Sequence, residues 1–382
     1  MKKLFYQPNF KLGVLGGGQL GRMLIQDAIN LNIAIHCLDP DVNAPCAKLA
    51  NSFQVGNLND YDTVMNFGKD KDVLTIEIEF VNVDALVDLE KQGVAVYPQP
   101  HVLKMIQDKG LQKEFYQKNN IPTAPFTIAK DLKDVKMQVS EFPFVLKLRT
   151  GGYDGKGVQV IKSKEVLDQA FDAPCIMETM VPFTKELSVI VARNAMGEVS
   201  TFPVVDMEFN PEANLVEFLF SPADISEEIE QKAIRIAKQV AEATQIIGVL
   251  AVELFLTASG DILVNEIAPR PHNSGHQTIE GNITSQYEQH LRAILNLPLG
   301  NTAITKPCVM INLLGAKGYE GDVYYEGIEK VLEMSGVHVH LYGKTITKPF
   351  RKMGHITVTD NTVYRAKAKA KKIQELLTLK TL

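Results

Sequence analysis

The chain contains the segment Val249-Leu250-Ala251-Val252-Glu253-Leu254-Phe255-Leu256, which is followed after a short turn by Ile262-Leu263-Val264-Asn265-Glu266-Ile267. Both segments are apolar runs with a glutamate inside, and turn-forming residues join them, so they predict a β-hairpin. With Ser259-Gly260 at the tip, Glu253 pairs directly across from Glu266 on one face of the sheet. Like charges that oppose each other across two strands destabilise the pair, and burial among apolar side chains adds to the cost.

A divalent cation reverses the sign of this repulsion. Two carboxylates and the adjacent amide of Asn265 are oxygen ligands suited to Mg²⁺, or Mn²⁺, that bridges nucleotide phosphates. The alternative is a register shifted by one residue, which places both acids in solvent. The hairpin therefore predicts a metal site at Glu253 and Glu266.

The loop after the second acid is Ala268-Pro269-Arg270-Pro271-His272-Asn273-Ser274-Gly275-His276. Its prolines stiffen the chain, so Arg270 and His272 are expected to lie close to the metal site. The planar fork of Arg270 suits a carboxylate or bicarbonate oxyanion. His272 and His276 have a zinc-like spacing, but Pro271 and Gly275 argue against the helix that such a site needs.

A glycine-rich segment, Thr150–Gly157, lies between two predicted strands and carries Lys156. It lacks the Gly-Lys-Ser/Thr ending of a P-loop, so a hairpin that closes over phosphates is the physical alternative. Lys147 precedes it in the strand Phe144–Arg149 and is expected to contact phosphate. A plain turn, with Lys147 on an exposed sheet face, is the competing interpretation.

A second glycine segment, Gly16-Gly17-Gly18-Gln19-Leu20-Gly21, follows a strand and opens a helix. Asp39 ends the next strand, where a dinucleotide-binding fold holds its ribose-binding acid. An NAD site is therefore one interpretation, and a turn for close strand–helix packing is the other.

Length and composition limit the class of protein. The 382 residues predict two to three domains, and the net charge of −5 offers no basic field for nucleic acid or an anionic membrane. Four cysteines without CxxC spacing favour a reduced cytoplasm, and no apolar signal segment or run of about 18 apolar residues is present.

The pattern changes twice along the chain. Residues 11–15, 33–38 and 73–78 predict strands, with helices over 23–31 and 84–92, so a parallel sheet is expected. A helix over 109–119 and an extended linker at 121–125 follow, and then strands at 144–149, 158–161, 175–179, 187–193 and 199–205. A helix over 225–244, begun at Asp224 with Glu227 as a capping box, leads to the acidic hairpin. Short strands (309–313, 337–342, 355–359) and a helix over 364–377 with a solvated lysine face end the chain.

Six segments together resemble the ATP-grasp family, and within it the 5-(carboxyamino)imidazole ribonucleotide synthases of purine biosynthesis. They are GGGQLGRM (16–23), TIEIEF (75–80), RTGGYDGKG (149–157), AVELF (251–255), NEIAPRPHNSGH (265–276) and FRKMGHITV (350–358). The resemblance implies an α/β and α+β architecture: a Rossmann-like domain (1–107), an ATP-grasp domain (108–306) with a mobile lid at about 123–182, and a small β-rich C-terminal domain (307–382).

The resemblance implies a carbon–nitrogen ligase. ATP would activate bicarbonate as carboxyphosphate, which carboxylates the exocyclic amine of 5-aminoimidazole ribonucleotide and yields ADP and phosphate. The implied cofactors are ATP and Mg²⁺ (or Mn²⁺), and the implied state is a cytoplasmic homodimer without nucleic-acid or membrane partners.

By position, the resemblance assigns roles to individual residues. The ATP contacts are Lys109, Lys147, Gly152, Tyr153, Asp154, Gly155, Lys156, Gly157, Val158, Glu178, Thr179, Met180, Val181, Glu186, Asn265 and Glu266. The ribonucleotide contacts are Gln19, Leu20, Glu77, Tyr153, Asp154, Asn273, Lys344, Arg351 and Lys352. The catalytic residues are Arg270, His272, Asp154 and Lys344, and the metal ligands are Glu253 and Glu266. Ala268 stands where many ATP-grasp proteins carry asparagine, so Asn265 is the substitute ligand, and Lys109 stands where relatives often have arginine.

Three alternatives remain at this point. A nicotinamide-dependent Rossmann dehydrogenase would use the first glycine segment but not the opposed acids. A non-catalytic nucleotide sensor would keep the ATP residues but not require Arg270, His272 and Arg351. A formate-dependent glycinamide ribonucleotide formyltransferase shares the E-x-x-P-R-P-H arrangement, although it tends to carry acids at the positions of Asn273 and Gln19.

Overall fold

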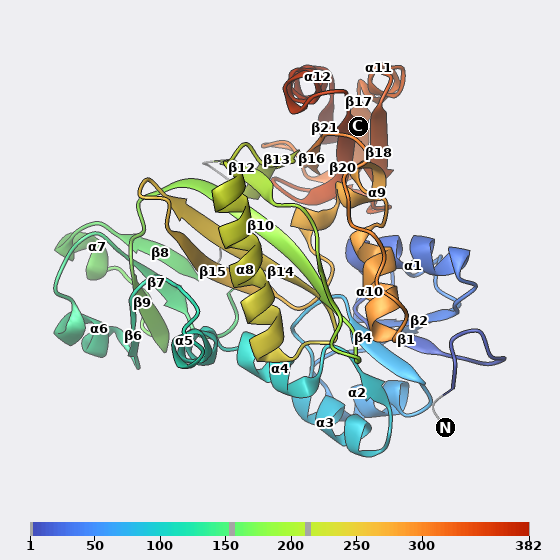
Figure 1. The fold of residues 1–382 in the computed structure, drawn as a ribbon, viewed down its shortest axis with the longest axis horizontal. Coiled ribbons are helices and arrows are strands. Elements are labelled where there is room, and N and C mark those ends of the chain that lie inside the picture. Colours follow the sequence, from blue (N-terminus) through green and yellow to red (C-terminus); the bar gives the residue numbers. More distant parts are fainter. Residues whose placement is uncertain (1–2, 153–156, 211–214, 382) are drawn as a thin grey trace.

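The computed structural model describes residues 3–152, 157–210 and 215–381 (Figure 1). The N-terminal part is a five-stranded parallel sheet in the order β3-β2-β1-β4-β5, as in Rossmann-like folds. Its elements are β1 (Leu12–Leu15), α1 (Gln19–Asn30), β2 (Ile35–Asp39), β3 (Ser52–Val55), α2 (Tyr61–Gly68), β4 (Val73–Ile76), α3 (Val83–Lys91), β5 (Ala95–Val96) and α4 (Pro100–Ile106).

The sequence predictions for this sheet are confirmed for β1, β2 and β4, whose side chains are almost all buried. Helix α1 begins at Gln19, directly after the glycines, and not at Met23 as predicted, because the apolar pattern becomes visible only one turn into the helix. The carboxyl ends of β1, β2 and β4 lead into Gly16, Asp39 and Glu77 at one edge of the sheet.

A separate antiparallel sheet in the order β6-β9-β7-β8 follows and forms the left side of the molecule in Figure 1, beside β15. Its elements are α5 (Lys109–Lys118), β6 (Phe126–Ala129), α6 (Leu132–Gln138), β7 (Phe144–Leu148), β8 (Val158–Ile161), α7 (Lys164–Leu167) and β9 (Cys175–Thr179). The glycine-rich segment joins β7 to β8, as predicted. It is held at its far end by Leu148, whose N–H donates to the Gly157 carbonyl at 2.8 Å.

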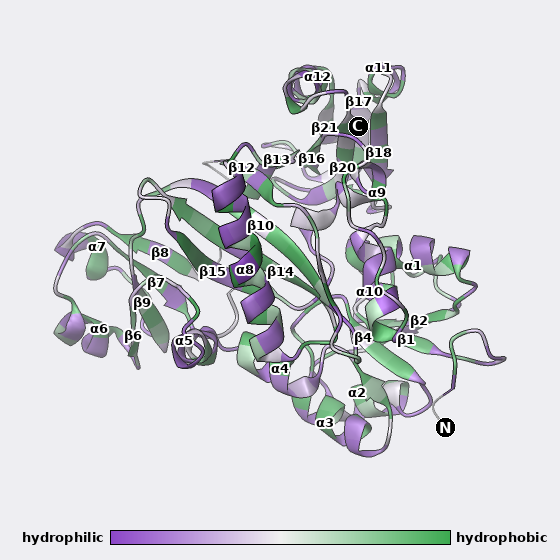
Figure 2. Cartoon of the chain, in the orientation of Figure 1, coloured by the Kyte–Doolittle hydropathy of each residue, from purple (hydrophilic) through white to green (hydrophobic). Residues whose placement is uncertain are grey.

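The largest sheet has nine strands and spans the central and C-terminal parts of the chain. The central elements are β10 (Phe183–Arg193), β11 (Val199–Thr201), β12 (Val205–Asn210), β13 (Leu215–Ser221), α8 (Glu227–Thr244), β14 (Gly248–Thr257), β15 (Ile262–Ala268), a 3₁₀ turn (Asn273–Gly275), α9 (Thr278–Gly281) and α10 (Gln286–Ile294). Helix α8 begins two residues later than predicted because Ser226, and not Asp224, caps it by accepting from the N–H of Ile229. The apolar stripe of α8 packs on β10, β14 and β15, while Figure 2 shows much of the helix as hydrophilic.

The C-terminal elements are β16 (Cys308–Leu314), β17 (Gly321–Glu326), α11 (Ile328–Leu332), β18 (Val337–Leu341), β19 (Ile346–Thr347), β20 (Lys352–Thr359), α12 (Val363–Leu376) and β21 (Thr378–Thr381). Strand β16 pairs with β13, so β16, β20 and β18 extend the central sheet. Strands β19, β17 and β21 form a small sheet of their own.

Helix α10 joins the central part to the N-terminal part. Its buried Tyr287, Leu291 and Ile294 pack into the same apolar cluster as residues of β1 and α1. Helix α10 therefore packs the central part of the chain against the N-terminal sheet.

Candidate active site

The acidic hairpin places Glu253 opposite Glu266, as the sequence predicts. The pairing near the turn is different from the prediction, however: Leu254 pairs with Val264 and Leu256 with Ile262, so the hairpin is centred on Ser259. Asn265 is the extra residue of a β-bulge between these two registers, and the bulge restores the opposition of the acids. If the register of Leu254 with Val264 continued without a bulge, Glu266 would pair with Val252 and lie on the core face, because a one-residue shift reverses the side-chain alternation.

Neighbouring strands complete this face. Glu253 also pairs with Ser188 of β10 on its other side, so Ser188, Glu253 and Glu266 form a row across three strands. The opposite face carries Val252, Leu254 and other apolar side chains against α8.

Two lysines contact the acidic end of the hairpin. The Nζ atom of Lys109 lies 2.7 Å from Oε2 of Glu266, and Nζ of Lys147 lies 2.9 Å from Oδ1 of Asn265. Lys109 lowers the pKa of Glu266, whereas burial, together with the charge of Glu266, raises the pKa of Glu253. The hairpin is thus a strongly charged surface, and the lysine that contacts Glu266 lies at its edge.

Lys109 is the first residue of helix α5, and hydrogen bonds between Asp108 and Arg149 fix the position of this helix start. Asp108 caps the helix and also receives two hydrogen bonds from Arg149, at 2.9 and 2.7 Å, at the end of β7. The N–H of Lys109 in turn donates to the Arg149 carbonyl. These bonds place the start of α5 beside the glycine-rich segment.

Lys113 is a functional candidate that the sequence analysis missed. Its Nζ lies 3.0 Å from Oε1 of Glu178, whose other oxygen contacts Lys147 at 2.9 Å. Burial lowers the pKa of Lys113 to about 8. Burial alone would raise the pKa of Glu178, but the two lysines lower it. The available signal was the spacing of Lys109 and Lys113, which lie one turn apart on one face of α5.

The segment predicted to contact adenine and ribose lies at the junction of β9 and β10. Glu178 is buried, Thr179 ends β9, Met180 is exposed and Val181 is partly exposed. Glu186 is two residues before Ser188 on the same face of β10, and burial raises its pKa to about 7. Beside it, Phe255 stacks on Phe183 with ring centroids 4.7 Å apart, an aromatic pair that was not predicted.

The loop after β15 brings His272 back to the acidic hairpin, as expected, whereas Arg270 forms an ion pair with Glu79. Nε2 of His272 lies 3.7 Å from Oε1 of Glu253, and Nε of Arg270 lies 2.9 Å from Oε1 of Glu79. Asn273 exchanges two hydrogen bonds with Asn312 of β16, at 2.9 and 3.0 Å. His276, by contrast, is fully buried against the Tyr287 hydroxyl, so the zinc-like spacing has a structural role.

The first glycine segment binds carboxylates of the protein itself. The N–H of Leu20, at the start of α1 beside Gln19, donates to Oε1 of Glu77 at 3.1 Å, and the N–H of Gly17 donates to Asp39 at 2.7 Å. A Cβ atom at Gly18 would lie 2.4 Å from Oε1 of Glu77, so the glycine provides room for this carboxylate. The position where a dinucleotide phosphate would bind is therefore filled by Glu77, which argues against the NAD interpretation.

The C-terminal part contributes basic groups. Nζ of Lys344 donates to the Lys352 carbonyl at 2.8 Å, and Arg351 donates to the Ile346 carbonyl at 2.6 Å. Burial raises the pKa of Glu253, and the charge of Lys352 opposes this rise.

The glycine-rich segment is described only at its two ends. Gly152 and Gly157 approach each other closely, since a Cβ atom at Gly157 would lie 3.2 Å from Cα of Gly152, and Val158 begins β8. The predicted contacts Tyr153, Asp154, Gly155 and Lys156 lie outside the described residues.

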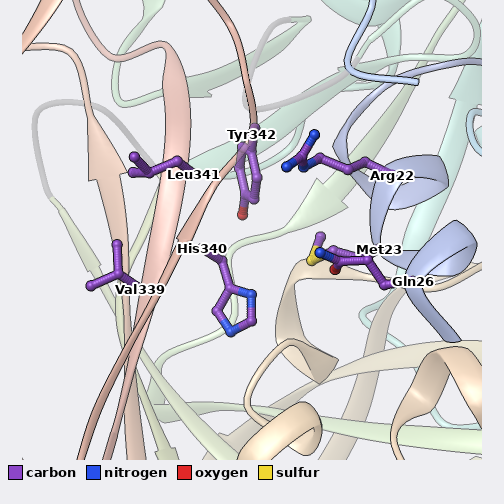
Figure 3. Close-up of a pocket in the computed structure, with 7 residues that line it drawn as sticks. All are labelled: Arg22, Met23, Gln26, Val339, His340, Leu341 and Tyr342. Carbon is purple, nitrogen blue, oxygen red and sulfur yellow. The ribbon is translucent and has the colours of Figure 1, made fainter. Parts of the chain in front are cut away.

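A small cavity of about 110 Å³ lies between α1 and β18. In Figure 3 Arg22 points toward Tyr342, and Gln26 lies near His340. None of the predicted site residues lines this cavity, so it is distinct from the acidic hairpin.

Comparison with known proteins accounts for the arrangement of the three parts. A ribonucleotide synthetase preATP-grasp domain matches residues 10–107, an ATP-grasp domain matches 114–287, and a phosphoribosylaminoimidazole carboxylase C-terminal domain matches 308–369. The N5-carboxyaminoimidazole ribonucleotide synthase of Bacillus subtilis is 40% identical over 365 residues, which cover 94% of this chain and 93% of the relative. The chain belongs to the N5-carboxyaminoimidazole ribonucleotide synthase family.

Other members of this synthase family agree with the assignment. The synthetase from Thermotoga maritima superposes with a TM-score of 0.91 at 42% identity and covers 98% of this chain and 100% of its own. The Aspergillus clavatus synthase, solved with ADP and 5-aminoimidazole ribonucleotide, has a TM-score of 0.86 at 34% identity and covers 96% of this chain and 98% of its own.

The synthase family also includes longer proteins. The chloroplastic phosphoribosylaminoimidazole carboxylase of Vigna aconitifolia is 41% identical over 92% of this chain, and this chain spans 64% of its length. In the described part of this chain, no helix combines the length and the apolar character that a membrane span requires.

Proposed function

We propose that this protein uses ATP and bicarbonate to carboxylate the exocyclic amine of 5-aminoimidazole ribonucleotide, giving 5-(carboxyamino)imidazole ribonucleotide, ADP and phosphate. The observation that carries the proposal is the opposed pair Glu253 and Glu266, bordered by Lys109 and reached by His272 at 3.7 Å. The choice of acceptor is supported by the A. clavatus synthase, which was solved in complex with 5-aminoimidazole ribonucleotide.

The residues fit a Mg²⁺ or Mn²⁺ ion that is shared with ATP. Within residues 3–152, 157–210 and 215–381, no group of three or more histidine, cysteine or acidic side chains could form a complete cage. Two carboxylates on one sheet face are what Mg²⁺ uses when phosphate oxygens supply the other ligands. The ion would offset charge on the transferring phosphoryl group. The oxygen of Asn265 would join Glu253 and Glu266 only when Lys147 turns from it toward phosphate.

Each part of the chain has a task in this proposal. Lys109, Lys147 and the segment Gly152–Val158 would hold the phosphates, Glu178–Val181 the adenine, and Glu186 the ribose. Arg270 and His272 would orient bicarbonate and then carboxyphosphate. The acceptor would lie between Gln19, Leu20, Glu77, Tyr153, Asn273, Lys344, Arg351 and Lys352, with Asp154 and Lys344 near its amine.

The reaction then consists of two displacements. A bicarbonate oxygen attacks the γ-phosphorus in line, the bond to the β-phosphate oxygen breaks, and ADP leaves. The amine attacks the carboxyl carbon of carboxyphosphate and expels phosphate, or it attacks CO₂ after carboxyphosphate has broken down to CO₂ and phosphate, and in both cases the amine loses a proton. The protein contributes position and electrostatic stabilisation, and no covalent nucleophile is required.

The test is ADP release with each acceptor, with and without bicarbonate. We expect ADP release that requires both 5-aminoimidazole ribonucleotide and bicarbonate, with ¹³C from labelled bicarbonate in the product. Turnover with formate and glycinamide ribonucleotide, hydride transfer from a nicotinamide cofactor, or ATP binding without turnover would each replace the proposal with one of the alternatives above.

We further propose a cytoplasmic homodimer. The four cysteines are buried free thiols, which fits a reducing compartment. Light scattering coupled to size-exclusion chromatography distinguishes a dimer from a monomer of 42.4 kDa.

A further inference from the structure

The two ring nitrogens of His272 have different environments. Nδ1 lies 2.9 Å from Oγ of Ser274 and also accepts from the backbone N–H of Ser274 at 3.3 Å. A backbone N–H can only donate, so Nδ1 must present its lone pair. In a neutral imidazole the proton is then on Nε2, the atom that lies 3.7 Å from Oε1 of Glu253.

The hydroxyl group of Ser274 is in turn hydrogen-bonded to the hydroxyl group of Ser188. Oγ of Ser274 lies 2.8 Å from Oγ of Ser188, and both side chains are completely buried. If Ser188 donates to Ser274, Ser274 donates to Nδ1, and the direction of the chain is uniform. Ser188 is also the residue of β10 that pairs with Glu253, so the chain of hydrogen bonds begins and ends beside the same acid.

The backbone of His272 is held independently of its ring. The N–H of His272 donates to Oε1 of Gln286 at 2.9 Å, and Nε2 of Gln286 donates to the His272 carbonyl at 2.7 Å. Because Gln286 on α10 is fully buried, the position of the loop does not depend on the serine hydroxyls.

We propose that Ser188 and Ser274 are positioning residues that keep His272 in its Nε2–H tautomer, so that its single ring N–H donates to an anionic oxygen of bicarbonate or carboxyphosphate beside Glu253. The identity of that oxygen rests on the proposed function, whereas the tautomer rests on the hydrogen bonds alone. In the other tautomer Nε2 would turn a lone pair toward Glu253, and the site would lose a donor where negative charge is transferred.

The tautomer is measured first, without turnover. Two-bond ¹H–¹⁵N correlation spectra of protein labelled with ¹⁵N-histidine distinguish the tautomers, and a His272→Gln variant assigns the signal. At mildly alkaline pH we expect the Nε2–H pattern for His272 in the wild type and a larger share of the Nδ1–H tautomer in Ser274→Ala, where only the backbone N–H at 3.3 Å still donates to Nδ1. An Nδ1–H pattern in the wild type would overturn the proposal.

Kinetics then test the consequence. Ser274→Ala and Ser188→Ala each remove one link, worth about one buried hydrogen bond, and we expect kcat to fall by roughly 5- to 10-fold with the KM for ATP unchanged. Ser274→Thr keeps the hydroxyl and should restore most of kcat. Thr357→Val is the matched control, since it removes a buried hydroxyl that has no hydrogen-bond partner in the described chain.

The outcomes separate the two proposals. Equal losses in kcat for Ser274→Thr and Ser274→Ala would mean that packing, and not the hydroxyl, matters, and would overturn the positioning role. A wild type that has the Nε2–H pattern but does not consume ATP with the aminoimidazole acceptor would overturn the proposed function and leave the tautomer assignment intact.

Discussion

The side chain of Glu77 occupies the helix start at which the glycine-rich segment Gly16–Gly21 would otherwise bind a phosphate. It accepts from the N–H of Leu20, and the pKa of its carboxyl group is raised to about 7 by burial, although Arg270 acts in the opposite direction. A glycine pattern followed by a helix specifies an anion site, but it does not specify whose anion binds there.

The raised pKa of Glu77 predicts a pH dependence of stability. The folded protein binds the proton more tightly than the unfolded chain, whose value is near 4.5, so the free energy of unfolding falls as the pH rises from about 4.5 to 7. In Glu77→Gln this contribution disappears, and the fall over the same window should be smaller. Urea denaturation at a series of pH values measures it, with the exposed Glu90→Gln as control. Parallel curves for Glu77→Gln and the wild type would contradict the shift.

Glu266→Gln tests the metal site. The change keeps the size of the side chain and an oxygen that can accept from Lys109, but it removes the charge that would hold the ion. We expect turnover to fall by at least ~10²-fold, while the thermal midpoint stays close to the wild-type value. The exposed Glu242→Gln is the matched control. Normal turnover of Glu266→Gln at limiting Mg²⁺ would show that the ion binds elsewhere.

At the scale of single residues, the sequence predicts which side chains lie together only when they are close along the chain. Glu253, Glu266 and the loop with His272 lie in one hairpin and its continuation, so their proximity was predictable. Lys113, Asn312 and Gln286 were not predicted, because their contacts depend on how distant segments pack and their local patterns resemble ordinary surface or helix residues.

At the scale of elements, the β15 strand shows how alternation can be misread. Its pattern predicts a strand that places the two acids opposite each other, which is confirmed, whereas the predicted register near the turn is wrong by one residue. The turn at Thr257–Asp261 closes around Ser259, with Gly260 at a φ of +82°, and the bulge at Asn265 absorbs the difference. Turn geometry and bulges depend on backbone angles that composition does not reveal.

The bulge predicts that deletion of Asn265 and deletion of Leu263 have different effects on stability. Removing Asn265 should leave Val264 opposite Leu254 and Glu266 opposite Glu253, so the buried face is preserved. Removing Leu263 instead turns Val264 outward and forces Asn265 toward the core. We expect the Leu263 deletion to lower the free energy of unfolding by at least about 2 kcal/mol more than the Asn265 deletion. Equal losses in chemical denaturation would contradict the bulge assignment.

The contact between the loop after β15 and helix α10 predicts that substitutions at Gly275 and Gln286 have non-additive effects on kcat. A Cβ atom there would lie 2.3 Å from Oε1 of Gln286, so Gly275→Ala should displace the amide that holds His272. Because two hydrogen bonds are lost, kcat should fall about 10-fold or more. Gln286→Ala should give a similar loss, and the double variant should be no worse than either single variant. Additive losses would mean that Gly275 acts independently of Gln286.

At the scale of the whole molecule, the site is assembled from all three parts. Strands β16, β20 and β18 continue the central sheet, and α10 packs into the N-terminal core. The order of strands and helices was largely predictable from periodicity, and the resemblance supplied the fold. That the C-terminal strands extend the central sheet was not predictable, because pairing between β13 and β16 leaves no local pattern.

This arrangement predicts that a substitution in the C-terminal part can weaken the binding of the acceptor without changing the binding of ATP. Arg351 belongs to the C-terminal part and follows, along the chain, every residue that is proposed to contact ATP. Its loss should remove one charge-assisted contact with the ribonucleotide phosphate, worth roughly 1.5–3 kcal/mol. Arg351→Ala should therefore raise the KM for the acceptor by about 10- to 100-fold and leave the KM for ATP unchanged. Arg365→Ala, exposed on α12, is the control. An unchanged acceptor KM in steady-state assays would remove Arg351 from the site.

The carboxylate at the start of α1 acts as a tethered ligand. Glu77 is held by its strand against the amide that receives it, so its effective concentration there exceeds the millimolar values that even flexible linkers provide. A free phosphate at millimolar levels would compete poorly with such a neighbour for the N–H of Leu20. The N-terminal part thus keeps the strand–glycine–helix backbone of a phosphate-binding fold, but the N–H of Leu20 that such a fold offers to phosphate already has a covalently attached partner.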